Sequence, residues 1–442
     1  MSESIGGSGK GMKLHTKILL ALVLGGVAGV VANLTLGGDD GRVVWVNTYL
    51  AGPVGQIFLR MLFMIVMPLV FSSIALGVAG LGDLRKVGKV GGKAIGYFFG
   101  TTAVAATFGL LMVNIIDPGS SVPENVKVEL MEVYADDASA KVEQNATGGF
   151  GINTFVNIVT RNPVKSAADT DMLGVIFFGL IFGAALTQLK PEQSAPMIKF
   201  LESLYEVVIV IVGMAMRLAP YGVAGLIFGV TSRFGFALLK PLGGYVIVVM
   251  SALLLHMFVN LSLILKFIIG ISPVTYFSRI KGALVTAFST SSSSATLPAA
   301  LRASQEGLGV PPKIAGFVLP LGSTMCMNGT SIFEGITVIF LCQVFGVDLS
   351  LGGMVVVIIM SVITAIGAAG VPGGSIPLLV GILAMMGVPG EAIAIVLGVD
   401  RILDMTRTVV NVASDISATT FVASSEKVWS AASIPAEAPT TA

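Results

Sequence analysis

The sequence is poor in charged side chains. Only 12% of its 442 residues are Asp, Glu, Lys or Arg, whereas 54% are hydrophobic, and mean hydropathy is +0.91. A soluble domain carries about 25% charged residues, so the composition excludes an ordinary soluble protein and favours a chain embedded in a lipid bilayer. The net charge is +1 at pH 7, which gives no reason to expect a nucleic-acid partner.

Histidine and cysteine are scarce as well, with two of each. The cysteines Cys326 and Cys342 lie in apolar surroundings and make a poor disulfide pair, and the spacing of a four-ligand metal site is absent. An enzyme would need a nucleophile beside a base. The serine run at 289–294 has no histidine near it in sequence, and His256 is the only candidate base. We therefore expect neither an enzyme nor an organic cofactor.

What the sequence has in abundance is apolar runs that can cross a bilayer, for which about 20 residues are needed. Two further apolar stretches, 275–308 and 352–388, are interrupted by STSSSSATLP and by GAAGVPGGSIP. Each has the length for two short helices joined by a tip, which enter and leave on the same side. We predict an all-α polytopic membrane protein with spans at 15–36, 52–80, 92–116, 172–189, 196–219, 241–271, 311–347 and 391–425.

Positive charge predicts the orientation of the chain in the membrane. Lysines precede the first span, and lysines and arginines follow the second and the sixth, all on one side. We therefore expect a cytoplasmic N-terminus and an external loop within 118–171. The lack of long loops of the eukaryotic kind indicates a prokaryotic inner (plasma) membrane. Residues 1–12 and 426–442 are expected to be a flexible and a disordered tail, respectively.

The interruptions suggest a binding site. In hydrocarbon every backbone polar group needs a partner, and transporters use broken helices to aim helix ends at substrates and ions. Small polar residues can also serve helix packing alone. An unbroken Ser/Thr run at 289–294 with a second broken segment in the same half favours a site. The stretch LPLGSTMCMNGTSIF at 319–333 also places glycines, hydroxyls and an amide within an apolar run, and it is a further candidate for a binding site.

A charged stripe follows one face of the last span. Asp400, Asp404, Arg407, Asn411 and Asp415 are spaced by four, three, four and four residues, which places them on one helical face. Ionisable groups at membrane depth are costly and usually functional. A ladder of internal ion pairs is the alternative. The planar fork of arginine suits a carboxylate, an aspartate can accept from an ammonium, and an aspartate beside an amide suits a hard cation, a preference of oxygen ligands that we extend to Na⁺.

The C-terminal half of the sequence resembles the dicarboxylate/amino acid:cation symporters, the glutamate transporter family. The likeness covers most of residues 14–425, and its motifs stand in the family's order: MPLVFSSIALGVAGL, SSSSATLP, LPLGSTMCMNGT, GAAGVPGG and DRILDMTRTVVNVASD. The resemblance implies eight membrane helices and two re-entrant hairpins built from inverted repeats. It also implies a homotrimer that works as an elevator-type transporter.

The resemblance further implies a division of each protomer. A fixed scaffold would comprise residues 13–90 and 172–220, and a mobile transport domain residues 91–117 and 221–425. The segment 118–171 would hold the external loop and the start of the fourth span. The tip at 365–376 would act as the lid.

The family's substrate site maps onto this chain position by position. Arg407 would bind the side-chain carboxylate of the substrate and Asp404 its ammonium group. The rest of the pocket would be Asn411, Thr408, Thr330, Ser293, Val371 and Gly373. Relatives for neutral amino acids lack the arginine, and relatives for dicarboxylates tend to lack the aspartate, so the pair indicates L-aspartate or L-glutamate. A C4-dicarboxylate or neutral amino acid carrier is the alternative; a dedicated channel is disfavoured, because no ring of pore charges is present.

The resemblance implies two sodium sites and a degenerate third. The first comprises Asp415, Asn411, Gly322 and Cys326, and the second Thr324, Met327, Ala365, Ile366 and Ala368. At the third, the family's Asn-Met-Asp-Gly-Thr reads Cys-Met-Asn-Gly-Thr, with Asn328 in place of the aspartate. Phe98 replaces a tyrosine there, while Thr101 and Thr102 remain.

The coupling ions implied are Na⁺, H⁺ or both. Without a carboxylate, neutral dipoles alone must offset the desolvation of Na⁺, so we predict that the third site is absent or weak. The alternative is that Asn328 still binds the ion through its amide oxygen. Glu334 matches the position of the proton carrier in proton-coupled animal members, which makes it the candidate proton carrier; the alternative is an ordinary buried polar group.

Overall fold

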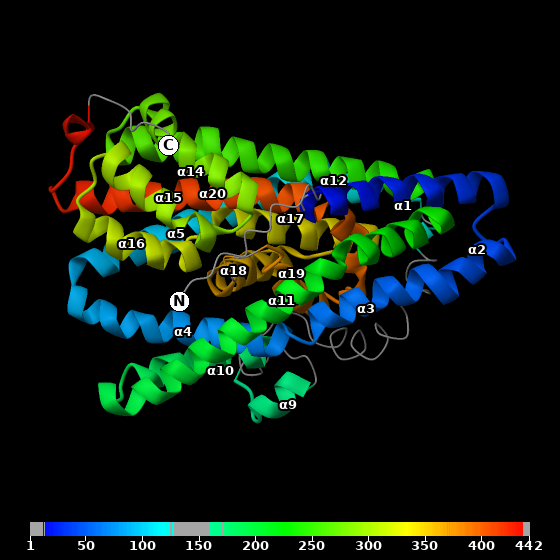
Figure 1. Cartoon of the computed structure of the whole chain (residues 1–442), viewed down its shortest axis with the longest axis horizontal. Coiled ribbons are helices and arrows are strands. Elements are labelled where there is room, and N and C mark those ends of the chain that lie inside the picture. The colour runs from blue at the N-terminus through cyan, green and yellow to red at the C-terminus, as the bar shows by residue number, and fades with distance from the viewer. Residues whose placement is uncertain are drawn as a thin grey trace.

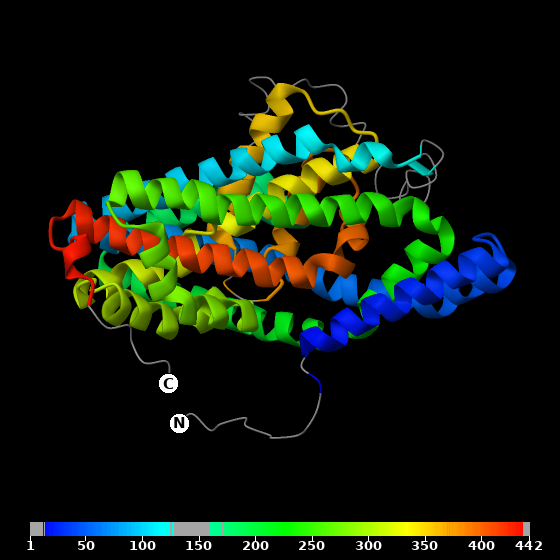
Figure 2. The same ribbon diagram turned by 90° about the horizontal axis from the view of Figure 1, so that it is seen from above.

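The computed structural model consists of helices, with no strand among the residues that it describes, which are Met12 and residues 14–123, 126–127, 159–168, 172–368, 370 and 372–435. The longer helices lie roughly along one axis of the molecule (Figures 1 and 2). The predicted all-α class is confirmed. Six helical stretches in these residues are long and apolar enough to cross a membrane: Thr16–Leu36, Gly41–Ala79, Lys89–Ser121, Pro191–Phe234, Phe236–Ile269 and Pro312–Val344.

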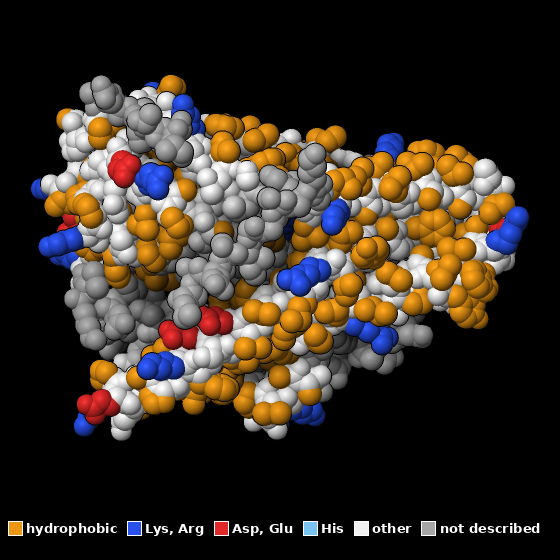
Figure 3. Space-filling view, viewed as in Figure 1, with side chains coloured by type: hydrophobic (Ala, Val, Ile, Leu, Met, Phe, Trp, Pro, Cys, Tyr) orange, Lys and Arg blue, Asp and Glu red, His pale blue; other side chains and the backbone are white. Residues whose placement is uncertain are grey.

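The N-terminal helices pack along the longest helix, α11 (Pro191–Phe234). A Cβ on Gly225 of α11 would lie 2.5 Å from the carbonyl O of Ala51, and such small residues let helix backbones approach closely in a membrane. Hydrophobic side chains cover much of the face over α1 and α3 (Figure 3). The N-terminal elements are α1 (Leu14–Leu36), α2 (Gly41–Val46), the π-helical turn η1 (Asn47–Ala51), α3 (Gly52–Phe63) and α4 (Val66–Val87).

The domain boundary that we expect between residues 220 and 221 falls inside α11, which continues without a break. Pro220 lies within the helix, but just beyond it Gly222 packs so closely on α3 that a Cβ would lie 2.4 Å from Cβ of Phe58. This packing holds the chain helical past the proline. The helix α11 ends before Gly235, whose φ is 55°, a conformation that glycine adopts readily. The division into scaffold and transport domain stays a prediction.

Helices from the middle of the chain flank this layer and the C-terminal half. The helix α10 packs on α4, where the rings of Phe71 and Phe178 stack with centroids 5.5 Å apart. A π-helical turn that begins at His256 interrupts the sixth predicted span; such turns occur frequently at functional sites. The elements are α5 (Lys89–Ile116), η2 (Pro118–Ser121), α9 (Pro163–Ala168), α10 (Met172–Leu186), α12 (Phe236–Leu255), η3 (His256–Asn260), α13 (Leu261–Leu263) and η4 (Ile264–Ile269).

Both interrupted stretches form two helices joined by a non-helical tip. At the first tip Ser291 has φ of 49°, and Oγ of Ser292 accepts from the backbone N of Ala295 at 3.1 Å, which caps the second helix of the pair. The polar residues thus end one helix and begin the next. The first pair is α14 (Pro273–Thr290) and α15 (Ser293–Arg302) with η5 (Ala303–Gly307), and the second is α18 (Leu351–Gly367) and α19 (Ile376–Met385) with η6 (Gly390–Ile393).

The most buried of the longer helices are α17 (Asn328–Val344) and α20 (Ala394–Ser425), and α16 (Pro312–Met325) precedes α17 in the chain. The helices α17 and α20 run through the middle of the molecule in both views (Figures 1 and 2). Between α16 and α17, Cys326 and Met327 have ψ of 76° and 54°, which are not helical. The glycines and polar residues of 319–333 therefore flank a helix break in the interior.

Residues 426–435, which we expect to be disordered, fold onto the molecule instead. Trp429 is buried, and its Nε1 donates to the carbonyl O of Leu308 at 2.7 Å. A buried indole with a satisfied N–H is stabilising, which the Ala/Pro/Thr-rich composition does not reveal. The turn η7 (Ala431–Ser433) follows. Apart from Met12, the expected N-terminal tail lies outside the described residues, as does most of the external loop.

Candidate functional site

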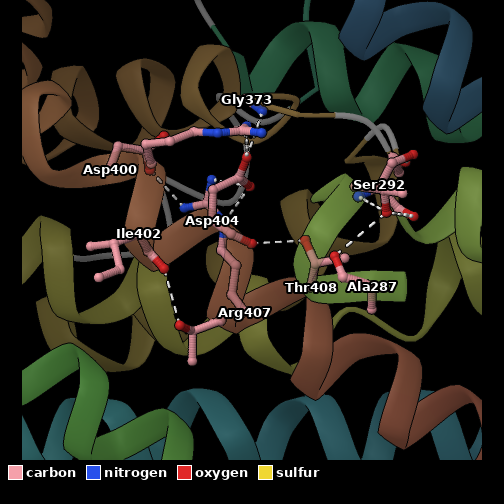
Figure 4. A network of polar contacts seen from close by, with 12 residues as sticks. Ala287, Ser292, Gly373, Asp400, Ile402, Asp404, Arg407 and Thr408 are labelled. Atoms are coloured by element: carbon pink, nitrogen blue, oxygen red, sulfur yellow. Dashed lines mark hydrogen bonds and ion pairs between the residues drawn. The ribbon is translucent and has the colours of Figure 1, made fainter. Parts of the chain in front are cut away.

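The charged stripe of the last span lies on α20, where the two helix tips and the break before α17 meet it. The tips contact each other, because Oγ of Ser292 donates to the carbonyl O of Gly370 at 2.6 Å. The three interruptions in the sequence therefore converge on one place. Figure 4 shows it, with labels on Asp400, Asp404, Arg407 and Thr408 of α20 and on Ser292 and Gly373 of the tips.

Four charged side chains form one buried cluster. Arg407 donates through Nη1 to Oδ1 of Asp400 at 3.0 Å, and through Nη2 and Nε to Oδ1 of Asp404 at 2.8 and 3.1 Å. Nη1 of Arg401 lies 3.2 Å from Oδ2 of Asp404. The ion-pair ladder that we considered for this stripe thus exists. Two arginines offset two aspartates, so each buried charge is paired.

Packing fixes the guanidinium of Arg407, which is 2% exposed. Its Cζ lies 4.0 Å from the ring centroid of Phe333, within the range of a cation–π contact. A Cβ on Gly329 would lie 2.4 Å from the carbonyl O of Arg407, so glycine is needed for the first turn of α17 to lie on α20. The arginine fork is therefore presented in a fixed orientation.

Asn411 joins α20 to the start of α17. Its Oδ1 accepts from the backbone N of Gly329 at 2.7 Å and of Thr330 at 3.4 Å. These are N–H groups of the first turn, which have no partner within a helix. Its Nδ2 lies 3.1 Å from Oγ1 of Thr330 and 3.3 Å from Sδ of Met327. The amide of Asn411 thus caps α17 and contacts the non-helical segment between α16 and α17, beside Arg407.

A small cavity of about 20 Å³ lies between these groups. A water-sized probe occupies about 10–15 Å³, so the cavity does not admit a dicarboxylic amino acid unless its walls move. Gly373 contacts the cluster through its backbone N, 3.2 Å from Oδ2 of Asp404, and Val371 lies outside the described residues. Of the predicted substrate residues, those that line the cavity are Ser293, Thr330, Asp404, Arg407, Thr408 and Asn411.

Three residues of this site, Ser291, Ser375 and Asp400, are not among those assigned to it from the sequence. Ser291 and Ser375 line the cavity from the two tips, and their buried hydroxyls have no hydrogen-bond partner in the described part of the chain. Asp400 was placed on the stripe but in no site, although it binds Arg407 directly. Its separation from Arg407 by seven residues, two helical turns, was a usable signal.

The first predicted sodium set is partly assembled around Asp415. Its Oδ1 is buried and has no hydrogen-bond partner among the residues that the structure describes. A Cβ on Gly322 would lie 3.1 Å from this oxygen, so the backbone of α16 passes close by, and the N of Cys326 donates to the carbonyl O of Gly322 at 2.8 Å. A buried, unpartnered carboxylate oxygen beside a helix end fits a hard cation.

The second predicted sodium set is more dispersed. Met327 contacts the substrate residues Thr330 and Asn411 through its sulfur. The side chain of Thr324 is exposed, and its hydroxyl donates to the carbonyl O of Leu321 at 3.0 Å. At the end of α18, where Ile366 lies, the N of Ala368 donates to the carbonyl O of Ala365 at 3.2 Å. That carbonyl is already engaged within the tip.

The residues of the third predicted sodium set lie together, and their polar side chains form hydrogen bonds with one another. Oδ1 of Asn328 accepts from Thr102 at 2.9 Å and from Thr101 at 3.4 Å, with Phe98 buried on the same helix. Its Nδ2 lies 3.1 Å from Oγ of Ser414 and 3.4 Å from Nε2 of His256. The histidine was weighed only as the base of an enzyme; nothing in its sequence neighbourhood indicates this contact.

Glu334 is fully buried on α17. Its Oε2 accepts from Oγ1 of Thr364 of α18 at 2.6 Å, while its Oε1 has no hydrogen-bond partner in the part of the chain that is described. An oxygen in this position can take a proton without losing a bond that it already makes. The alternative of an ordinary, fully satisfied polar group therefore accounts for only one of the two oxygens.

Comparison with known proteins finds related transport proteins whose similarity extends over nearly the whole chain. The chain is 35% identical over 400 residues to the proton/sodium-glutamate symport protein of Geobacillus stearothermophilus, covering 90% of this chain and 91% of the relative. It is 33% identical over 410 residues to the proton/glutamate-aspartate symporter of Escherichia coli (strain K12), covering 93% and 92%. The C4-dicarboxylate transport protein of Bacillus subtilis (strain 168) is 34% identical over 416 residues, covering 94% and 95%.

The family model that matches covers residues 14–425 and describes membrane symporters rather than enzymes. With the apolar helices of the structure, this makes the protein a multi-pass membrane protein. The chain belongs to the sodium:dicarboxylate symporter family.

Proposed function

We propose that the protein is a secondary active symporter of acidic amino acids, L-aspartate or L-glutamate, driven by a cation gradient. One observation carries the proposal: Arg407 and Asp404 lie side by side, buried, on the wall of a cavity between two helix tips. The arginine fork matches the side-chain carboxylate of such a substrate, and the aspartate matches its ammonium. The relatives whose names mention glutamate support the same substrate class.

Access to this site requires movement. The cavity is too small for the substrate, and Gly373 of the second tip bonds Asp404 directly. The tip at 365–376 would therefore lift as a lid. The finer architecture that goes with this motion is also a proposal: eight membrane helices, two re-entrant hairpins, a homotrimer and an elevator movement, in a plasma membrane with the N-terminus cytoplasmic.

The coupling ion would bind at Asp415, because its Oδ1 is buried and has no hydrogen-bond partner among the described residues. The amide oxygen of Asn328 accepts from Thr101 and Thr102, and its Nδ2 donates to Ser414. These bonds support the loss of the third sodium site, because an ion there would have to displace them. Glu334, whose Oε1 has no hydrogen-bond partner in the described part of the chain, would carry a proton.

A C4-dicarboxylate is the second candidate substrate. The relative from Bacillus subtilis carries that name, and Asp404 already has a cationic partner in Arg401, so a substrate without an ammonium leaves it paired.

The experiment that tests the proposal is binding of a substrate panel to the purified full chain in detergent with saturating NaCl. Isothermal titration with L-aspartate, L-glutamate, L-serine and succinate compares acidic, neutral and non-amino ligands. We expect the two acidic amino acids to bind and L-serine not to bind. Binding of L-serine without L-aspartate would contradict the proposal.

A further inference from the structure

A second arginine, Arg401, lies at the edge of the charged cluster, and not all of its N–H donors are used there. Its side chain is 9% exposed, and its Nη1 lies 3.2 Å from Oδ2 of Asp404. Its Nε is buried and has no hydrogen-bond partner within the described residues. Arginine has five N–H donors, and buried donors are normally satisfied. The contact with Asp404 therefore leaves Arg401 incompletely bonded, unlike Arg407.

The carboxylate of Asp404 is divided between the two arginines. Its Oδ1 accepts two bonds from Arg407, at 2.8 and 3.1 Å. Its Oδ2 accepts from Arg401 and from the backbone N of Gly373, each at 3.2 Å. A substrate ammonium that pairs with Asp404 has to take one of these oxygens. The longer, single contacts are at Oδ2, so the ammonium and Arg401 compete for that oxygen.

We propose that Arg401 determines how strongly the site requires an ammonium group on its substrate. The inference rests on the function proposed above. With Arg401 on Oδ2, a dicarboxylate that lacks an amino group leaves Asp404 paired. A substrate with an ammonium displaces Arg401 from Oδ2. Its binding free energy then gains only the difference between the ammonium–Asp404 pair and the Arg401–Asp404 pair that it replaces. Arg401 therefore narrows the difference in affinity between amino dicarboxylates and plain dicarboxylates, and specificity is such a difference.

The charges of the cluster lead to the same conclusion. Asp400 and Asp404 are offset by Arg401 and Arg407, so the buried cluster is neutral. Replacement of Arg401 by glutamine would leave one uncompensated negative charge, which is strongly unfavourable in a buried site. The ammonium group of an amino dicarboxylate would offset this charge, whereas a plain dicarboxylate brings no positive charge to offset it. Loss of Arg401 must then increase the preference for the amino dicarboxylate.

The test is competition between L-aspartate and succinate, which differ by the amino group, on the purified full chain with saturating NaCl. In Arg401→Gln we expect the ratio of the Kd for succinate to that for L-aspartate to rise by about tenfold or more. Arg401→Lys keeps a cation that still competes, so its ratio should rise less; it also serves if the glutamine variant does not fold. Arg302→Gln, which removes an exposed arginine at the end of α15, should leave the ratio unchanged.

The outcomes separate this inference from the proposed function. A parent that binds neither ligand contradicts the proposed function. A parent that binds L-aspartate while a large excess of succinate does not compete overturns the inference, because Arg401 would then not relax the requirement. An unchanged or lowered ratio in both Arg401 variants also overturns it, since a lowered ratio would mean that Arg401 itself binds a substrate carboxylate.

Discussion

The guanidinium of Arg407 is held by Asp400, Asp404 and the ring of Phe333, and its planar fork is what the proposed substrate requires. Lysine would keep the charge but offer a single compact ammonium. We expect Arg407→Lys to weaken L-aspartate binding by at least about tenfold, measured by isothermal titration. Arg302→Lys, on the exposed end of α15, is the matched control. Parental affinity in Arg407→Lys would show that the fork does not bind the substrate.

Asp415 is the residue that the sodium proposal depends on. In Asp415→Asn the buried oxygen beside Gly322 loses its charge, so Na⁺ would no longer be attracted strongly. We expect the dependence of L-aspartate affinity on Na⁺ concentration to become shallower, by about one bound ion. Asp39→Asn, at an exposed position, should leave it unchanged. A sodium dependence as steep as that of the parent would exclude Asp415 as a ligand.

Asn328 offers the converse experiment, in which a charge is added. Asn328→Asp places a carboxylate beside Thr101 and Thr102, and a buried carboxylate needs a cation. We expect the sodium dependence of L-aspartate binding to become steeper, by about one ion. If the steepness does not change, the missing charge is not what disables the third site.

At this scale the sequence was informative where residues share one helix. The stripe from Asp400 to Asp415 follows from helical spacing alone, and the cluster in the structure includes its first three members. The contacts of Ser291, Ser375 and His256 depend on which elements meet in space. Periodicity within a single helix contains no such information.

Among the elements, the contact of α17 with α20 is the one that positions the site. A Cβ on Gly329 would lie 2.4 Å from backbone of α20, and backbone cannot move aside as a flexible side chain can. Overpacking of this kind costs about 1–3 kcal/mol. We expect Gly329→Ala to lower the melting temperature and to weaken L-aspartate binding. In Gly316→Ala of α16 the new Cβ would meet nothing within 4 Å, so little change is expected; equal behaviour of the two variants would contradict the packing argument.

The helix tips and the break before α17 were predictable as elements, because polar residues interrupt apolar runs at 289–298, 319–333 and 367–377. The length of α11 was not predictable from the sequence. A proline in the interior of a helix usually kinks or breaks it, but α11 continues beyond Pro220, where Gly222 packs closely on α3. The ordered segment at 426–435 depends on one indole contact with Leu308, which composition does not indicate.

For the whole molecule, the composition and the apolar runs were sufficient for an all-α membrane protein. Mechanism is a property of the whole molecule. The predicted substrate and lid residues come from α14–α20, the predicted ion residues come from α5 as well, and a carrier has to expose such residues alternately on two sides. The charged side chains that we propose as substrate ligands are offset within the molecule. A substrate with net negative charge therefore needs co-transported cations, which is the physical reason to expect coupling.

The most direct test is uptake of L-[³H]aspartate into proteoliposomes that contain the full chain, with an inward Na⁺ gradient, an inward H⁺ gradient, both, or neither. We predict accumulation with the Na⁺ gradient, because Asp415 supplies an ion site, further accumulation when H⁺ is added if Glu334 carries a proton, and none without a gradient. Glu334→Gln should then remove only the response to H⁺. Failure to accumulate aspartate under any gradient, by a protein that binds it, would contradict the account.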